Sequence, residues 1–245
     1  MKIWSKLRLG DGKASPDKSG IERFYERRRL VYNSYMTWHE AIGRALLIFL
    51  SFAFIHSLCV TSFIKSQTQR LLGETFVRVF YRFIYTCFSA VTVVLAIYLI
   101  NMLPDVYLFR GTAWFRWAMH AIQIAGFIFG TLSFEAINSY EFVGITQVWR
   151  YITKREVQGD AEGITQTRLV KTGIYGIVRH PLYLAGIIIF TFEPNITRNW
   201  LAVSILADAY FVFGAFIEEK RLIRTFGDEY IEYMKRVPGF LPKIL

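Results

Sequence analysis

The chain has very few of the residues that build disulfide frameworks or metal centres. Its 245 residues include two cysteines, Cys59 and Cys87, and both lie inside apolar stretches. We expect them to pack as small hydrophobic side chains, without a disulfide framework. The four histidines are scattered without an H-E-x-x-H pattern, and no metal-ligand spacing is present. The sequence therefore predicts no metal site.

Acidic residues are also scarce, because 19 Asp and Glu stand against 29 Lys and Arg, for a formal net charge of +10. The basic residues cluster beside apolar runs, which favours loops that face anionic lipid over a nucleic-acid-binding face. We therefore expect membrane lipid as a partner, no nucleic acid and no obligate protein partner. The first 40 residues are polar and lack the apolar core of a signal peptide, so we expect no cleaved secretion signal.

Apolar residues are what the chain has in excess: 53% of residues are hydrophobic and 17% are aromatic. This is more apolar than an average soluble domain. Three runs approach the ~20 residues that cross a bilayer as a helix, namely Leu46–Ile64, Phe83–Leu103 and Trp117–Ile137. Leu182–Phe192 is too short to span, and Trp200–Ile217 is longer. Pro194 and Asn195 between these two runs predict a helical hairpin over 182–217.

These runs predict an all-α, polytopic integral membrane protein with about five transmembrane segments, including the C-terminal hairpin, and an amphipathic C-terminal helix. We expect a polar or amphipathic lead-in over 1–40, three transmembrane helices over 41–138, and a region over 139–245 that carries the polar motifs. Within the lead-in, Glu22–Trp38 mixes aromatic and basic residues as an interfacial helix would, and a solvated tail is the alternative. Lys and Arg are more numerous in the segments expected on the same side of the membrane as the C-terminus, which predicts a cytoplasmic C-terminus.

Two adjacent carboxylates, Glu218 and Glu219, follow the last apolar run, where we expect an amphipathic helix to begin. Ionisable side chains at membrane depth are costly and are functional candidates. Asp208 lies 11 residues before Glu219, a rotation of about 1100° that puts both carboxylates on one helix face. A carboxylate at a wet membrane edge suits a cationic ligand or a ribose. The alternative is a solvated helix start whose carboxylates pair with the basic residues that follow them.

The short apolar run opens with Arg179, His180 and Pro181. A proline at the first helical position sets the turn, and the backbone N–H groups at that helix start can receive a carboxylate or a ribose. Arg179 can pair with a ligand carboxylate. His180 precedes the helix and is either a structural cap or a ligand-binding residue.

Beyond the carboxylates, apolar and aromatic residues recur at helical spacing, and we expect most of them to serve packing. They are Leu222, Phe226, Tyr230, Tyr233 and Val237. Arg236 precedes Pro238 and is placed to fold back on the same site.

In order, these segments read GIYGIVRHPLYLAG over Gly173–Gly186, EEKRL over Glu218–Leu222 and FGDEYIEYMKRVP over Phe226–Pro238. Together they resemble the signature of the membrane-embedded S-adenosylmethionine methyltransferases, which include isoprenylcysteine carboxyl methyltransferases and phospholipid methyltransferases. Shorter segments look like the methanethiol S-methyltransferase branch, which includes the NnrU-like membrane proteins. They are His56-Ser57, Tyr81-Arg82, Ser133-Phe134, Tyr140 to Gly144, Gln147 to Trp149 and Pro194 to Thr197.

The resemblance implies a site for S-adenosyl-L-methionine and for a small-molecule or lipophilic methyl acceptor. The implied cofactor-binding residues are Arg179, His180, Pro181, Leu182, Tyr183, Leu184, Glu218 and Glu219. The implied catalytic residues are Arg236 and Tyr230, which would orient the methyl acceptor, and His56, which like Arg236 would favour ionisation of a thiol.

The reaction implied first is direct SN2 methylation of a small thiol, methanethiol to dimethyl sulfide, helped by alignment and desolvation of the reactants. One alternative is carboxyl methylation of an isoprenylcysteine or N-methylation of a phospholipid. A further alternative is a non-enzymatic, NnrU-like accessory membrane protein. The resemblance favours the bacterial cytoplasmic membrane, or the endoplasmic reticulum if the source is eukaryotic.

Overall fold

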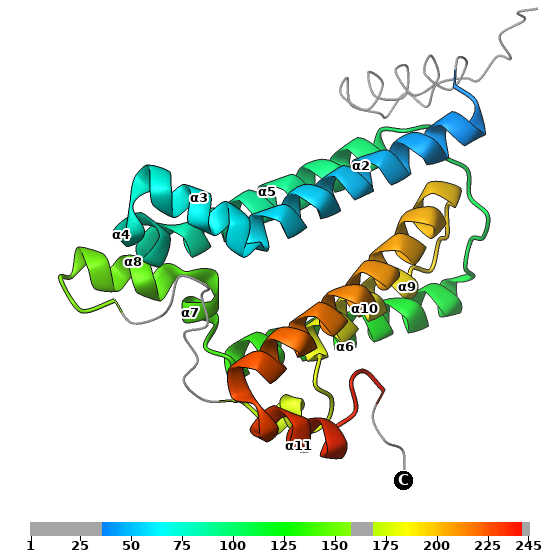
Figure 1. The fold of residues 1–245 in the computed structure, drawn as a ribbon. Coiled ribbons are helices and arrows are strands. Elements are labelled where there is room, and N and C mark those ends of the chain that lie inside the picture. Colours follow the sequence, from blue (N-terminus) through cyan, green and yellow to red (C-terminus); the bar gives the residue numbers. More distant parts are fainter. Residues whose placement is uncertain (1–35, 158–168, 242–245) are drawn as a thin grey trace, which may run out of the picture.

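The computed structural model describes residues 36–157 and 169–241, and in these two ranges the regular elements are all helical (Figure 1). The all-α prediction is confirmed. A single isolated β-bridge joins Tyr107 to Thr197 within the same ranges. The interfacial helix expected over Glu22–Trp38 lies almost entirely outside the described residues.

Within the described ranges, four helices are long and apolar enough to cross a membrane. They are α2 (Trp38–Val60), a continuous helix over Glu74–Asn101, α6 (Ala113–Ala136) and α10 (Arg198–Phe226). The second of these comprises α4 (Glu74–Phe76), a π-helical turn η1 (Val77–Tyr81) and α5 (Arg82–Asn101). The three apolar runs expected before residue 139 and the longer run after Pro194 are all helical, so the polytopic membrane architecture is confirmed.

The fifth apolar helix, α9 (Pro181–Thr191), has 11 residues and is too short to cross alone. Pro181 occupies the start of the helix, as expected. After Thr191 the chain turns, and the Thr197 hydroxyl accepts a hydrogen bond from the backbone N–H of Trp200 to begin α10. Because α9 packs against α10, the predicted helical hairpin is confirmed.

The helix boundary expected at Glu218 is wrong, because α10 continues through both carboxylates to Phe226. Glu, Lys, Arg and Leu all favour helix, so a change from apolar to charged residues does not by itself end one. The helix ends at Gly227, whose φ of 55° is a left-handed value that glycine adopts without strain. The amphipathic helix α11 (Asp228–Arg236) begins only after this glycine.

The four long helices and the shorter α9 pack in the order α5, α2, α10, α9, α6 (Figure 1). Close approach of α6 to α9 depends on small side chains, since a Cβ at Gly126 would lie 2.7 Å from Ile188 and one at Gly130 would lie 3.1 Å from Ala185. Such small-residue contacts are typical of helix pairs in membranes. The remaining apolar surface of the long helices is largely exposed, as expected where lipid is the solvent.

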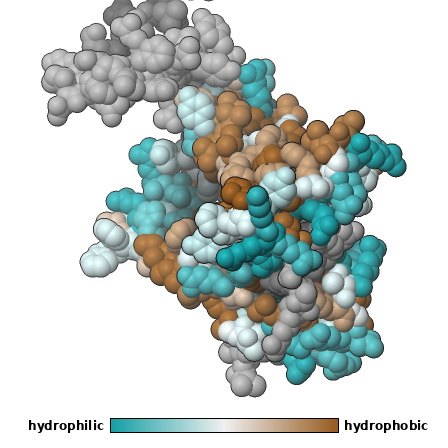
Figure 2. Space-filling view, turned by 90° about the vertical axis from the view of Figure 1, so that its left-hand side faces the viewer, coloured by the Kyte–Doolittle hydropathy of each residue, from teal (hydrophilic) through white to brown (hydrophobic). Residues whose placement is uncertain are grey.

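Short helices gather at one end of the long ones (Figure 1). They are α3 (Ser62–Leu72), α7 (Ser139–Val143), α8 (Ile145–Ile152) and the 3₁₀ turn η2 (Gly173–Gly176). Figure 2 looks onto the end that carries α3, α4 and α8, where hydrophilic residues cover much of the surface beside hydrophobic patches. The C-terminal end of α10 and the start of α9 lie at this same end.

Two buried clusters hold the structure together. The first joins α2, α5 and α10 through residues such as Phe49, Ile100 and Ala207. The second lies under α11 and contains the whole apolar stripe expected from the sequence, together with Leu169, Ile223 and Met234. The packing role predicted for that stripe is confirmed.

Candidate functional site

The centre of the site is an ion pair between Arg179, just before α9, and Glu219 on α10. The Arg179 Nε and Nη2 atoms lie 3.0 and 2.6 Å from Glu219 Oε1. Both side chains are largely removed from solvent, with 12% and 13% exposed. Because a buried ion pair of this kind requires additional hydrogen bonds to offset desolvation, its surroundings decide whether it is stable.

Those additional bonds come from the segment that ends α11 and follows it. The Arg179 Nη1 atom donates to the carbonyl oxygens of Met234 and Val237. The backbone N–H of Arg179 donates to Pro238 O at 2.9 Å, and that of His180 donates to Gly239 O at 3.1 Å. The R-H-P turn is therefore bonded directly to the V-P-G segment, which connects the first and last motifs of the sequence.

His180 contacts both carboxylates of the cluster. Its Nε2 atom lies 2.9 Å from Glu219 Oε1, and its Nδ1 atom lies 3.6 Å from Glu218 Oε2. The side chain is 3% exposed and is flanked by the rings of Tyr183 and Phe240 at centroid distances of 5.7 and 5.6 Å. Both carboxylates therefore converge on one imidazole.

Three tyrosines lie around the charged cluster, Tyr175 and Tyr230 near the carboxylates and Tyr233 near Arg179. Tyr230 is 1% exposed, and its hydroxyl makes no hydrogen bond to any described residue. Burial raises the pKa of Tyr230, and the negative charge of Glu219 raises it further. Burial also raises the pKa of Tyr175, with the charge of Glu218 adding to it, and raises the pKa of Tyr233 to about 12. All three phenols are neutral donors at physiological pH.

The carboxylates lie at the rim of the membrane region. From Arg198, the ~20 residues that cross the hydrocarbon core end close to Ile217. Glu218 and Glu219 are the next two residues of α10, and Glu218 is half-buried while Glu219 is largely covered. The expectation of a polar site at a membrane exit therefore follows from helix length as well as from sequence pattern.

A sequence model of the NnrU protein family matches residues 45–193. The chain belongs to the NnrU family. The match includes Arg179 and His180 of the site and ends before the two carboxylates. The family and branch expected from the sequence motifs are thereby confirmed.

Curated relatives extend the likeness beyond the NnrU match. Methanethiol S-methyltransferase 1 of Bradyrhizobium diazoefficiens is 27% identical over 203 residues, which cover 83% of this chain and 67% of that protein. The methanethiol S-methyltransferase of Pseudomonas sp. is 26% identical over 208 residues, which cover 85% and 76%. The nickel-cobalt-cadmium resistance protein NccN of Alcaligenes xylosoxydans xylosoxydans is 34% identical over 85 residues, which cover 34% and 39%. No solved structure matches the chain.

Most of the predicted binding residues of this NnrU-family chain come together. Arg179 pairs with Glu219, His180 lies against both Glu218 and Glu219, and the Tyr183 hydroxyl lies near Glu218. Pro181, Leu182 and Leu184 form the adjoining first turn of α9. Sequence reasoning missed Tyr175, although it lies inside the first motif. Arg221 was expected only among the basic residues that pair with the carboxylates, and its Nη2 does lie 3.8 Å from Glu218 Oε1, while its Nε is buried without a hydrogen-bond partner among the described residues.

Two other ionisable candidates lie apart from this cluster. The Arg236 side chain is exposed, and its Nε donates to Glu232 O one turn earlier in α11. Asp208 accepts a hydrogen bond from the Thr191 hydroxyl near the end of α9, about 16 Å along α10 from Glu219. We expected Arg179 to pair with a ligand carboxylate, but its guanidinium already donates hydrogen bonds to the Glu219 carboxylate.

His56 lies in a second polar group between α2, α5 and α10. Its Nε2 is 2.8 Å from the Tyr85 hydroxyl and its Nδ1 is 3.1 Å from Ser89 Oγ. The Tyr210 hydroxyl lies 2.8 Å from Ser57 Oγ beside it. Within the described ranges, no group of three or more His, Cys, Asp or Glu side chains is arranged to hold a metal ion.

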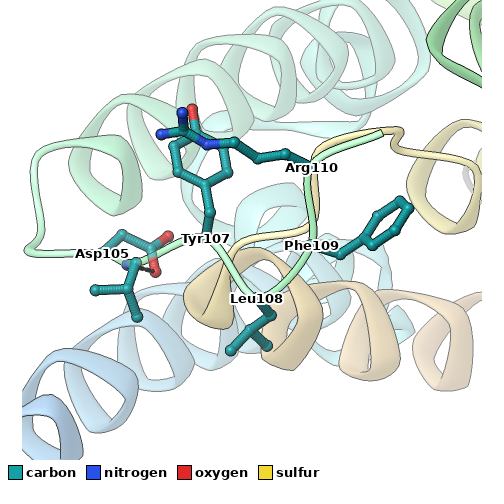
Figure 3. A pocket seen from close by; sticks show the side chains of 6 residues that line it. Asp105, Tyr107, Leu108, Phe109 and Arg110 are labelled. Carbon is teal, nitrogen blue, oxygen red and sulfur yellow. Dashed lines mark hydrogen bonds between the residues drawn. The ribbon is translucent and has the colours of Figure 1, made fainter. Parts of the chain in front are cut away.

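The opposite end of the molecule has a different, shallow hollow over residues 105–110 (Figure 3). Tyr107 and Arg110 point to one side of this loop and Leu108 points to the other, with the Arg110 guanidinium 3.9 Å from the Tyr107 ring centre. The loop is pinned to the start of α10 by the Asn199 amide, which donates to Pro104 O at 3.0 Å. Some 20 residues of α10 separate Asn199 from Glu219, about 30 Å, so the two sites are distinct.

Proposed function

We propose that this protein is an integral membrane methyltransferase that converts methanethiol to dimethyl sulfide. The observation that carries the proposal is the buried cluster of Arg179, His180 and Glu219, which joins the R-H-P, E-E and V-P motifs into one site. The name of several relatives, methanethiol S-methyltransferase, supports the choice of methyl acceptor.

We propose S-adenosyl-L-methionine as the methyl donor, and the residues of the site fit this group. It supplies an electrophilic methyl group on a positively charged sulfur. Tyr230 Oη and Arg221 Nε are buried polar atoms without a partner in the described chain, which is the condition expected of groups that bind a polar ligand. Glu218 keeps its carboxylate half-exposed beside them and is available to a cation or to ribose hydroxyls.

Within this arrangement the two carboxylates have different roles. Glu219 Oε1 accepts from both Arg179 and His180, so Glu219 orders the turn that begins α9. Leu182, Tyr183 and Leu184 in that first turn form the apolar border of the site. Glu218 is the carboxylate we assign to ligand contact. His56 remains our candidate on the side of the methyl acceptor. We assign Tyr230, which the resemblance put on that side, to the donor, because its buried hydroxyl has no partner among the described residues.

We place the protein in a bacterial cytoplasmic membrane with the site and the C-terminus on the cytoplasmic side. The relatives named above are bacterial, and the four apolar helices fit a membrane protein. Basic residues concentrate at the end that bears α3, α8 and α11, and such residues favour the cytoplasmic face. We also propose that residues 139–245 act as the donor-binding region and that 41–138 form its membrane scaffold.

The test uses detergent-purified protein with S-adenosylmethionine and methanethiol, with dimethyl sulfide detected in the headspace. We expect product from the wild type and a loss of at least a hundredfold in Glu219→Gln. Glu232→Gln is the matched control, because that carboxylate is exposed and pairs with Lys235 on the surface of α11. Equal activity of Glu219→Gln and Glu232→Gln would remove the assigned site.

A lipid methyl acceptor is the first alternative, and activity on membrane extracts without activity on methanethiol would establish it. The second alternative is a non-enzymatic accessory protein, which the partial likeness to a metal resistance protein keeps in view. Absence of S-adenosylmethionine binding at millimolar concentration, measured by equilibrium dialysis, would favour that alternative.

A further inference from the structure

A cavity of about 210 Å³ lies between α2, α5, α9 and α10. Its walls are mostly aliphatic and aromatic, and its polar side chains include His56, Asn101 and Tyr210. It extends from Asn101 at the end of α5 and Trp200 at the start of α10 to His56 and Tyr210 within the spanning segments, where polar side chains are costly and mark functional sites.

The size of the cavity restricts what can bind there. Pockets for drug-sized ligands measure roughly 300–1,000 Å³, whereas a water occupies about 30 Å³ in the liquid. The cavity therefore accommodates a molecule of a few heavy atoms and not a whole prenyl or acyl chain. Its walls are well packed, because Phe190 stacks on Trp200 at 5.4 Å and Phe49 meets Tyr210 edge-on at 6.3 Å.

One polar group is held in the cavity wall by its neighbours. The His56 ring is hydrogen-bonded to the Tyr85 hydroxyl at 2.8 Å and lies 3.1 Å from the Ser89 hydroxyl. On its other side, the Tyr210 ring lies 6.5 Å from the imidazole. The network fixes the imidazole in an otherwise apolar space. Both ring nitrogens have hydroxyl partners, so a thiol hydrogen-bonds to the ring by replacing the more distant of them, the Ser89 hydroxyl.

A short aromatic path connects the cavity to the carboxylates. Phe211 lines the cavity, and its ring lies 6.3 Å from that of Tyr183. Tyr183 in turn lies 5.7 Å from His180 of the donor site. Tyr183 lies in α9 and Phe211 in α10, so both belong to the helical hairpin. The cavity and the carboxylate site therefore share the wall that these two rings form.

We propose that this cavity is the binding site of the methyl acceptor, and that its aromatic walls restrict the acceptor to short-chain alkanethiols positioned by His56. The proposal rests on the proposed function and adds its substrate class. Ala207 and Phe52 both line the cavity, from α10 and α2, so a change in the size of either side chain changes its free volume.

The first experiment compares kcat/KM for methanethiol and 1-butanethiol. Phe52→Ala enlarges the cavity, and we expect it to raise the preference for butanethiol over methanethiol at least tenfold. Ala207→Phe fills the cavity, and we expect KM for methanethiol to rise at least tenfold with donor binding unchanged. Ala209→Phe is the matched control, because Ala209 is exposed on the same helix. An unchanged thiol preference in a folded Phe52→Ala protein would overturn the proposal.

A second experiment needs no catalysis. Ala207→Cys is made in a background carrying Cys59→Ser and Cys87→Ser, and its labelling by methyl methanethiosulfonate is timed with and without dimethyl sulfide as the probe ligand. We expect dimethyl sulfide to slow labelling at least fivefold, and to leave Ala209→Cys unaffected. Equal labelling rates with and without the probe overturn the cavity. Protection in a protein that methylates no thiol would reject the proposed function while retaining the binding site.

Discussion

The guanidinium of Arg179 donates to the carboxylate of Glu219 across 40 residues of sequence, at 2.6 Å from Nη2 to Oε1. Arg179 precedes a helix too short to span the membrane, and Glu219 lies beyond the spanning length of the next helix. The pair thus closes the helical hairpin at its open end.

Removing the guanidinium should unfold the site. In Arg179→Ala, Glu219 stays largely covered without its cation, and two carbonyl oxygens near the end of α11 lose their donor. Breaking one side of a buried pair costs about 3 kcal/mol or more, so we expect a clearly lower thermal midpoint and loss of activity. Arg179→Lys keeps the positive charge but lacks the planar set of N–H donors of the guanidinium, so it should recover the stability only in part. A thermal midpoint of Arg179→Ala within error of the wild type would contradict this assignment.

Tyr230→Phe separates ligand binding from packing. The substitution deletes a buried hydroxyl that has no hydrogen-bond partner in the described structure and leaves the ring in place. Stability should stay the same within about 0.5 kcal/mol or rise slightly, since no bond is lost. If the hydroxyl binds the methyl donor, KM for S-adenosylmethionine should rise about tenfold, which is about 1.4 kcal/mol of lost interaction. Unchanged donor KM would remove Tyr230 from the donor site.

Arg236→Ala should be nearly silent. The side chain is exposed, and its Nε donates to Glu232 O in its own helix, away from the carboxylate cluster, so we expect kcat/KM to change less than threefold. Arg179→Ala measured in the same assay provides the contrast. A large loss in Arg236→Ala would instead show that this arginine turns into the site when substrate binds.

Packing of the hairpin can be tested at Gly186. A methyl group there would approach two Phe211 ring atoms to 2.7 and 2.8 Å. Gly186→Ala should therefore destabilise the protein by roughly 1–3 kcal/mol, as overpacked cores do. Gly43→Ala is the control, because nothing lies within 4 Å of its added Cβ and alanine favours helix. Equal thermal midpoints for the two variants would refute the close approach of α9 to α10.

Alkaline pH should loosen the C-terminal cluster. Burial raises the pKa of Tyr233 to about 12, above the ordinary tyrosine value of about 10. Between these two values the unfolded chain releases a proton that the folded protein retains, so stability falls as pH rises through this window. Circular dichroism and tyrosinate absorbance should therefore change together. Tyr233→Phe should flatten the dependence on pH, and an unaltered profile would contradict the assignment.

Sequence patterns predicted the helices, the hairpin and the meeting of both carboxylates with the R-H-P turn, because each depends on local composition and spacing. They failed where a local signal was ambiguous. Charged residues after Ile217 indicated a helix end, yet only Gly227 provides one. The engagement of Arg179 with Glu219 and with backbone carbonyls depends on how α11 folds back, and no spacing rule encodes that turn.

The cavity was also beyond reach of the sequence. His56 was a candidate through resemblance alone, and its partners Tyr85 and Tyr210 come from two other helices. Such a group appears only when helices far apart in the chain are packed together. The volume between them depends on which side chains fail to fill the space, and that is a property of the whole arrangement.

The bonds from Arg179 and His180 to Pro238 and Gly239 also bear on biogenesis. All four long helices have already been synthesised before these last partners leave the ribosome. A nascent chain inserted in the membrane therefore holds its arginine and its carboxylates without the carbonyls that complete them. Assembly of the site therefore follows synthesis of the long helices, and translation products that stop before Pro238 should remain inactive even when they are fully inserted.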